Sequence, residues 1–240
     1  MVKVNIGCSG FMYNHWLRTF YPEEIPKRRW FEYYSGIFDT VELNVTFYRL
    51  PKAETFQKWY DITPKTFSFS LKGSRFITHI KRLNEPRDAL KRFFDAVMNL
   101  KEKLSVILWQ LPLGMKYEPG RFSDFISLLE NYRVRNAFEF RHESWINGDT
   151  IDALKKSGYA LCMTDWPEFN KEHPLTADFV YMRRHGYGGS YNTCYSREDL
   201  KKDARKIRDY LKKGTDVYIY FNNDANGYAP KNALELKELL

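Results

Sequence analysis

Cysteine is scarce in this sequence of 240 residues, and the scarcity excludes a fold that depends on disulfides or on zinc. The three cysteines, Cys8, Cys162 and Cys194, lie far apart along the chain. Their number and spacing fit neither a disulfide framework nor a zinc finger. Cys8 and Cys162 fall at apolar positions of β-rich segments, where we expect buried free thiols.

Long apolar runs are also missing, as is the pattern of a secretory leader. No stretch approaches the roughly 18 apolar residues that span a bilayer. Residues 1–6 lack the basic start and the apolar core of a signal peptide. We therefore expect a cytoplasmic protein that makes no contact with a membrane.

Acidic residues are outnumbered by basic ones. The chain has 38 Lys and Arg against 30 Asp and Glu, which gives a formal net charge of +8. This modest excess favours an anionic partner, either a phosphate-containing small molecule or nucleic acid. It does not specify an oligomeric state.

Eight short β-rich segments alternate with helical ones. The β-rich segments are residues 2–7, 40–44, 66–72, 105–110, 136–141, 159–165, 179–185 and 216–222. Helices are predicted over residues 27–36, 53–61, 86–103, 120–131, 149–157, 197–213 and 230–240. Such alternation implies parallel strands with right-handed crossovers, and eight units favour closure into a (β/α)8 TIM barrel.

No linker or low-complexity tract interrupts this pattern, so we predict one domain over residues 1–240. The alternative is an open, doubly wound sheet. Against it, Gly7 and Gly10 after the first strand lack the third glycine and the ribose-binding acid of a dinucleotide fingerprint.

Polar residues occupy the inward positions of the predicted strands. In a barrel, alternate residues point inward. Towards the C-terminal ends of the strands the inward positions hold Glu42, Lys72, Gln110, Glu139, Arg141, Arg183, His185 and Asn222. Burying an uncompensated charge costs several kcal/mol, and barrel enzymes build their sites at this end. We therefore predict a catalytic site at an open, hydrated rim; the alternative is a buried salt-bridge network that serves only stability.

These residue types suit an enzyme, predicted to be a hydrolase, that acts on an anionic, phosphate-containing substrate. Glu42 or Glu139 would act as general base and His185 as general acid. The cations Lys72, Arg141 and Arg183 would bind the anion and stabilise developing charge. The remaining predicted substrate-binding residues are Asn44, Tyr48, His79, Gln110, His142, Asp165 and Asn222.

Two other functions remain open at this point. Glu42 and Glu139 could form the carboxylate pair of a glycosidase. The protein could instead be a nucleic-acid-binding module without catalysis. No cofactor is expected, although histidines at several strand ends, together with the acidic side chains, could hold a divalent metal. The three cations would oppose such a metal electrostatically.

The sequence resembles a known family, the domain of unknown function 72, whose members are called YecE-like. The resemblance covers nearly the whole chain. It is carried by Ile6-Gly7-Cys8-Ser9-Gly10-Phe11, Val41-Glu42-Leu43-Asn44-Val45-Thr46-Phe47-Tyr48, Lys72, Thr78-His79, Gln110-Leu111-Pro112, Glu139-Phe140-Arg141-His142, Tyr181-Met182-Arg183-Arg184-His185-Gly186 and Tyr220-Phe221-Asn222-Asn223.

The resemblance implies a TIM barrel and no specific function. A likeness of such barrels to metal-dependent DNA-repair endonucleases implies one further alternative, in which the metal ligands would be His79, Glu139, His142, Asp165 and His185. Arg184 departs from the family pattern, which usually has an apolar or aromatic residue there. This charge puts the outward packing of its strand in question.

Overall fold

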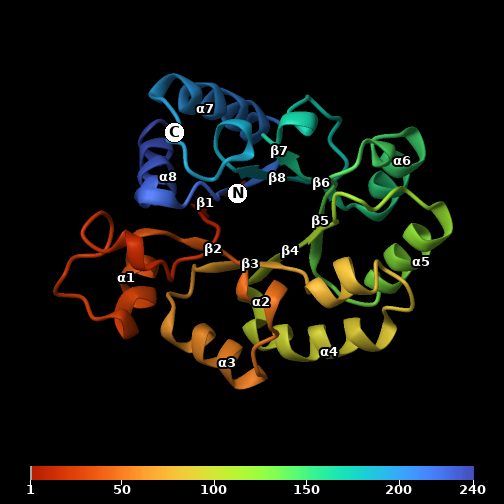
Figure 1. Cartoon of the computed structure of the whole chain (residues 1–240), viewed down its shortest axis with the longest axis horizontal. Helices are drawn as coiled ribbons and strands as arrows, with labels where there is room; N and C mark the ends of the chain where they lie inside the picture. Colours follow the sequence, from red (N-terminus) through yellow and green to blue (C-terminus); the bar gives the residue numbers. More distant parts are fainter. Residues whose placement is uncertain (1) are drawn as a thin grey trace.

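Parallel strands occupy the centre of the molecule and helices surround them (Figure 1). The computed structural model describes residues 2–240. The strands are β1 (Val4–Cys8), β2 (Thr40–Leu43), β3 (Ser68–Lys72), β4 (Leu104–Gln110), β5 (Arg135–Glu139), β6 (Ala160–Leu161), β7 (Met163–Thr164), β8 (Phe179–Arg184) and β9 (Asp216–Phe221). Each predicted strand is present, and the sixth consists of two pieces, β6 and β7.

The strands form two parallel ladders, ordered β1-β9-β8-β7 and β2-β3-β4-β5-β6. Between β1 and β2 the ladders are joined by an isolated bridge from Ser9 to Glu42. At the other junction, Cys162 separates β6 from β7 and donates its N–H to the carbonyl of Phe138 at 2.8 Å. Neighbours therefore follow chain order around the molecule, which is the order of a TIM barrel, although hydrogen bonding is not continuous at these junctions. The open, doubly wound alternative does not fit this order.

The helices match the predicted segments closely, except for the short helix at Val45–Tyr48, which the sequence did not predict. They are α1 (Trp30–Ile37), α2 (Val45–Tyr48), α3 (Ala53–Ile62), α4 (Arg87–Val97), α5 (Pro119–Leu129), α6 (Gly148–Ser157), α7 (Arg197–Lys212) and α8 (Tyr228–Glu238). The helix predicted over residues 86–103 is shorter, because the chain tightens after Val97 and Lys101 adopts a φ of 50°. Within residues 2–240, no helix has the length and apolar character needed to cross a membrane.

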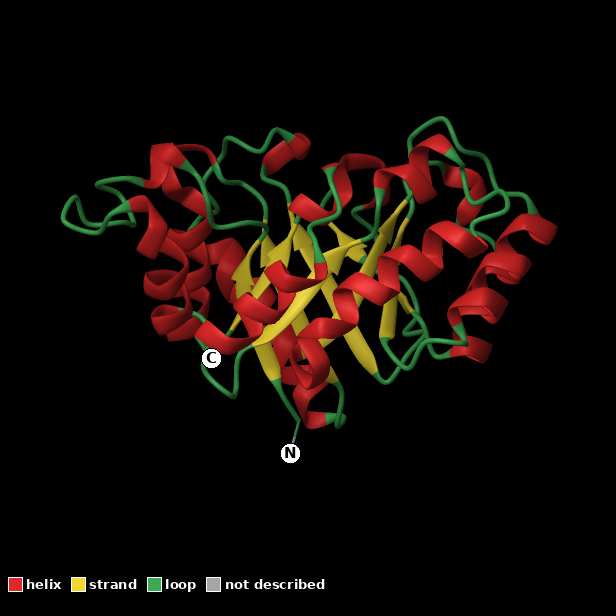
Figure 2. Cartoon of the chain, turned by 90° about the horizontal axis from the view of Figure 1, so that it is seen from below, coloured by secondary structure: helices red, strands yellow, loops and turns green. Residues whose placement is uncertain are grey.

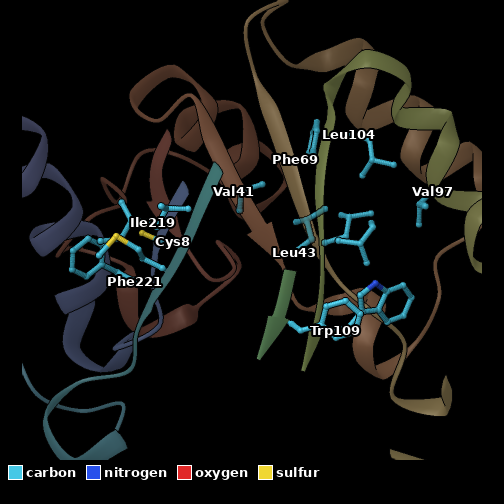
Figure 3. Close-up of a cluster of buried hydrophobic side chains, with 14 of the residues drawn as sticks. Cys8, Val41, Leu43, Phe69, Val97, Leu104, Trp109, Ile219 and Phe221 are labelled. Carbon is cyan, nitrogen blue, oxygen red and sulfur yellow. The ribbon is translucent and has the colours of Figure 1, made fainter. Parts of the chain in front are cut away.

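Alternation along the strands produces two apolar clusters. Val41 and Leu43 of β2, Phe69 of β3 and Trp109 of β4 point outward into the cluster between the strands and the helices (Figure 3). The inward residues form a second cluster inside the barrel, made of Val106, Leu108, Ala137, Ala160, Cys162, Phe179, Tyr181, Tyr218 and Tyr220. Cys8 and Cys162 are buried free thiols, as predicted.

Arg184 on β8 is accommodated by an ion pair rather than by apolar packing. Its Nε donates to Oδ2 of Asp203 on α7 at 2.7 Å, and both side chains are largely buried. The charge that departs from the family pattern is therefore neutralised by the helix that covers the strand.

The loops that follow the strands gather at one edge of the molecule. Figure 2 shows the strand arrows pointing the same way, with loops and short helices beyond their tips. The last residues of β2, β3, β5 and β8 meet at this edge. The apolar inner cluster fills the barrel interior below them.

Candidate functional site

Arg183 lies between two glutamates at the C-terminal end of the barrel. Its Nη2 donates to Oε1 of Glu42 at 2.8 Å, and its Nη1 donates to Oε2 of Glu139 at 2.7 Å. Arg183 is 1% exposed and both glutamates are 0% exposed. We call Glu42, Arg183 and Glu139 the inner triad. The predicted convergence of these three side chains is present, but they are buried, so the expectation of a hydrated rim is wrong for them.

Both carboxylate oxygens of Glu42 accept hydrogen bonds from neighbouring side chains. Besides both contacts from Arg183, at 2.8 and 3.1 Å, it accepts from Ser9 Oγ at 2.5 Å and from Tyr181 OH at 2.7 Å. A carboxylate with this many partners and no exposed surface is held in place. As a general base it stays a prediction, and one that the geometry disfavours.

Glu139 connects the inner triad to Arg141 and His185. Its Oε1 accepts from Arg141 Nη2 and lies 3.5 Å from His185 Nε2. Burial raises the pKa of Glu139, but the charges of Arg183 and Arg141 outweigh this and hold the pKa below its usual range. Glu139 is therefore a carboxylate in this site.

His185 is buried and sits between an acid and two guanidinium groups. Its Nδ1 lies 3.2 Å from Oδ1 of Asp165, and its Nε2 lies 3.0 Å from Arg183 Nη1 and 3.2 Å from Arg141 Nη2. Burial lowers the pKa of His185, the hydrogen bond to Asp165 opposes this, and Arg183 lowers it further. A neutral ring fits: Nδ1–H donates to Asp165 and Nε2 accepts from the guanidiniums. A general-acid role would require the imidazolium, which this environment disfavours.

Asp165 holds the loops above the site together. It accepts from the backbone N–H of His185 at 2.8 Å and from the hydroxyl of Tyr195. Burial raises the pKa of Asp165, and hydrogen bonds with His185 and Tyr195 together with the charge of Arg184 lower it overall. Its arrangement is that of a residue that orients His185.

Arg141 differs from Arg183 because part of its guanidinium has no partner. It stacks on Trp166, with 3.9 Å between its Cζ and the ring centroid. Its Nη2 binds Glu139, whereas its buried Nε has no hydrogen-bond partner among the described residues. Arg141 is 7% exposed. A buried donor without an acceptor is costly, so this edge of Arg141 is suited to an added anion.

Lys72 at the end of β3 is a second cation without an acceptor. Its Nζ lies over the ring of Phe47, 4.2 Å from the centroid, and nothing in residues 2–240 is seen accepting a hydrogen bond from it. Burial and the charge of Arg183 lower the pKa of Lys72 to about 8, against the attraction of Glu139 and Glu42. We call Lys72 and Arg141 the mouth pair.

Asn44 lies beside Lys72. Leu43 pairs with Leu71 in the ladder, so the residues that follow, Asn44 and Lys72, are neighbours. Thr46 Oγ1 donates to the Lys72 carbonyl at 2.6 Å and fixes the two segments together. Oδ1 of Asn44 is buried and, in the part of the chain described, has no donor. It is an acceptor available to a ligand.

The other predicted residues lie around this group with looser connections. Tyr48 is 77% exposed, and Gln110 donates to the carbonyl of its neighbour Leu111 at 2.8 Å. His142 accepts from the N–H of Ser144 at 3.2 Å, so it caps its own loop. Asn222 is buried at the end of β9. His79 packs edge-on against Phe47, and burial and the charge of Lys72 lower its pKa to about 4.

The five metal ligands implied by the endonuclease likeness do not form a ligand set. Among the described residues, no group of three or more His, Cys, Asp and Glu side chains is placed to hold a metal ion. Glu139, Asp165 and His185 do adjoin, but the guanidinium groups of Arg183 and Arg141 bind both Glu139 and the Nε2 of His185. Guanidinium groups there disfavour a cation.

Sequence reasoning missed Ser9, Phe47 and Tyr195. Ser9 follows Asn5 and Gly7 at alternate positions of the first strand, so extending the alternation by one step would have found it. Tyr195 lies in a loop and reaches Asp165 through the fold alone. No periodicity in the sequence points to it.

Comparisons with known proteins place the chain among relatives of unknown function. The family model described as "Protein of unknown function DUF72" matches residues 5–240. The UPF0759 protein YunF of Bacillus subtilis (strain 168) is 24% identical over 255 residues, which cover 92% of this chain and 90% of the relative. The crystal structure of a DUF72 family protein from Thermotoga maritima MSB8 is 29% identical, with a TM-score of 0.86 over 99% of this chain and 98% of that one.

The fold is also similar to that of a sugar epimerase. The crystal structure of D-psicose 3-epimerase in the presence of D-fructose superposes with a TM-score of 0.59 and 10% identity, over 99% of this chain and 96% of that one. At this identity the likeness concerns the fold alone, and it supports the TIM-barrel-like architecture.

Proposed function

The chain belongs to the DUF72 family, and we propose that it is an enzyme acting on a small anionic, phosphate-containing substrate at the C-terminal mouth of the barrel. The observation that carries the proposal is the contrast between two kinds of cation in one site. Arg183 has two carboxylate partners, whereas Lys72 and the Nε edge of Arg141 lack acceptors in the described chain.

A bound phosphate would complete this arrangement. Its oxygens would accept from Arg141 Nε and from the Lys72 ammonium, and guanidinium groups bind such anions with directed hydrogen bonds. The two cations are close enough for the charge of Arg141 to lower the pKa of Lys72. Two like charges close together favour an anion between them.

The reaction that we propose is hydrolysis of a phosphate ester. Lys72, with a pKa of about 8, is mostly protonated at neutral pH and would donate a proton to the leaving oxygen. The inner triad and the Asp165–His185 pair would hold Arg141 in place without touching the substrate. This gives Glu42, Glu139 and His185 positioning roles in place of the catalytic roles expected from the sequence.

The glycosidase alternative is less well supported. A glycosidase needs two carboxyl groups that reach the sugar, whereas Glu42 and Glu139 are fully buried and both bind Arg183. Within residues 2–240, no contact specifically favours nucleic acid as the partner.

The test is phosphate release from a panel of phosphomonoesters, including p-nitrophenyl phosphate. We expect turnover that inorganic phosphate inhibits and that falls by about 10²-fold or more in Lys72→Met, because the acid is removed. Lys65→Met is the matched control, since Lys65 is exposed on the surface. Equal turnover in Lys72→Met and Lys65→Met would contradict the assignment.

A further inference from the structure

We propose that the side-chain amine of Lys72 is a nucleophile that forms an imine with an aldehyde or ketone carried by an anionic substrate. The inference rests on the anion site of the proposed function and assigns it a second chemistry beyond hydrolysis. In this inference the nitrogen atom of Lys72 attacks a carbonyl carbon, whereas in the proposed function its ammonium binds an anion and donates a proton.

The surroundings of Lys72 differ from those of a structural lysine in the same chain. Lys103 is buried, and its Nζ donates to the carbonyls of Tyr60 and Thr63 at 2.6 and 2.8 Å and to the Thr63 hydroxyl at 3.0 Å. Lys72 Nζ meets the face of Phe47, and no acceptor for it is seen within residues 2–240. Among the described residues no acceptor holds the Lys72 amine, so no hydrogen bond within the protein has to break before it attacks an electrophile.

Burial and the charge of Arg183 favour the neutral amine that such an attack requires, whereas Glu139 and Glu42 favour the ammonium. Lys72 is close to the cations Arg183 and Arg141 and to the acids Glu139 and Glu42, and His79 and Arg75 lie on the short helical segment that follows β3. With a pKa of about 8, about one amine in ten is neutral at pH 7. For an unperturbed lysine the fraction is about one in three thousand. A lysine activated by burial beside another cation is an established route to imine chemistry.

The step balances without an oxidant or a reductant. The ammonium releases one proton, and the amine nitrogen adds to the carbonyl carbon while the C=O π bond opens. A second proton passes from nitrogen to oxygen and gives a carbinolamine. Its hydroxyl takes up one proton and leaves as water, and the nitrogen lone pair forms the C=N bond. One ammonium and one carbonyl thus give one iminium and one water, with the charge unchanged.

The two unpartnered groups nearby match the parts of such a substrate. Nε of Arg141 would bind the anionic end, and Oδ1 of Asn44 would accept from a hydroxyl, either that of the carbinolamine or one next to the carbonyl. The substrate class is therefore a small hydroxylated aldehyde or ketone with a phosphate or carboxylate group. Its iminium would act as an electron sink for breaking an adjacent C–H or C–C bond.

The experiment is reductive trapping on the intact protein. Glycolaldehyde phosphate or neutral glycolaldehyde is added with sodium cyanoborohydride, which reduces an iminium to a stable secondary amine. Peptide mass spectrometry then gives the rate of labelling at each lysine. In the wild type, Lys65 is the exposed reference and Lys103 the buried, hydrogen-bonded one. We expect Lys72 to be labelled at least tenfold faster than either, and faster by the phosphorylated probe than by the neutral one.

The outcomes separate this inference from the anion site. If Lys72 reacts preferentially but equally with both probes, the nucleophile is supported and the anion site is contradicted. If Lys72 reacts no faster than Lys65, the nucleophile is overturned, and protection of the same sample by inorganic phosphate in a thermal-shift assay still tests the anion site. Because the comparison is made within the wild-type protein, it does not depend on the folding of a variant. The variant Lys72→Gln should lose the fast-labelled peptide and keep the slow ones.

Discussion

The inner triad and the mouth pair contain the same kinds of charged side chain, but they differ in how completely those side chains are paired. In the inner triad, Glu42 accepts four hydrogen bonds and Arg183 binds two carboxylates. In the mouth pair, Lys72 lies on an aromatic ring and Arg141 has an unpartnered Nε. A network whose charges are all paired stabilises the fold. A network with unpaired donors can instead bind a ligand that supplies the missing acceptors. On the proposed function, the triad belongs to the scaffold and the mouth pair binds the substrate.

The largest expected effect follows from removing the cation of the inner triad. Arg183→Met leaves Glu42 and Glu139 buried with reduced compensation, and we expect a loss of about 3–5 kcal/mol in the free energy of unfolding. Urea denaturation measures it, with Arg28→Met at an exposed position as the control. A small effect would mean that water reaches the triad. Viewing Arg183 as one of three crowded cations on an open rim would favour an unchanged or raised melting temperature, and its burial argues against that view.

A smaller loss is expected when one hydrogen bond to the triad is removed. Tyr181→Phe deletes the donor to Glu42 Oε2, and hydrogen bonds to charged groups contribute about 1.5–3 kcal/mol. Tyr60→Phe removes an equivalent bond to Glu102 on the surface and should cost less than about 1 kcal/mol. Equal losses in the two variants, measured by urea denaturation, would remove the distinction between the triad and an ordinary surface contact.

Removing the cation Lys72 of the mouth pair should raise the free energy of unfolding rather than lower it. The pKa of Lys72 in the folded protein is about 8, below the ordinary value of 10.5, so the charged form destabilises the fold. This cost is fully present below pH 8 and disappears as the pH rises through 10.5. Lys72→Met should therefore gain about 1 kcal/mol at pH 7, discounted because the ammonium is partly solvated.

Unfolding measured at pH 7 and at pH 10 checks this prediction, because the gain should shrink at the higher pH. A gain that stays constant over this range would show that the substitution acts through packing rather than through the charge. Lys65→Met should show neither the gain nor the pH dependence, since Lys65 is exposed.

The smallest expected effect is the metal content of the purified protein. We expect purified protein to carry less than about one equivalent of zinc or manganese, because the guanidiniums of Arg141 and Arg183 oppose a cation beside Glu139 and His185. Elemental analysis is the measurement. A full equivalent that is lost in His185→Ala would support the metal-dependent alternative and would contradict the anion site.

Much of this site could be predicted from the sequence, because alternation along a strand shows which side chains point into the barrel. Glu42, Glu139 and Arg183 occupy inward positions of their strands, and parallel strands bring their C-terminal ends together. Alternation does not specify distance across the barrel, so it could not show that Arg183 would reach both glutamates and become buried. Nor could it show that Trp166 would stack on Arg141, because loop residues have no periodicity to read.

His142 illustrates the same limit at a single position. It follows Arg141 directly, and its chemistry suggested substrate binding. Adjacent residues in an extended chain point to opposite sides, and His142 instead accepts the Ser144 N–H in its own loop. Residue type alone therefore predicts a site residue less well than residue type combined with the direction of the side chain.

Calorimetric titration with inorganic phosphate tests the division between scaffold and mouth most directly. The wild type and Tyr181→Phe should bind phosphate with the same Kd, because Tyr181 contacts only the inner triad among the charged groups of the site. Lys72→Met should bind at least about tenfold more weakly, which corresponds to about 1.4 kcal/mol for one lost charged contact. Unchanged phosphate binding in Lys72→Met, or loss of binding in Tyr181→Phe, would contradict the account.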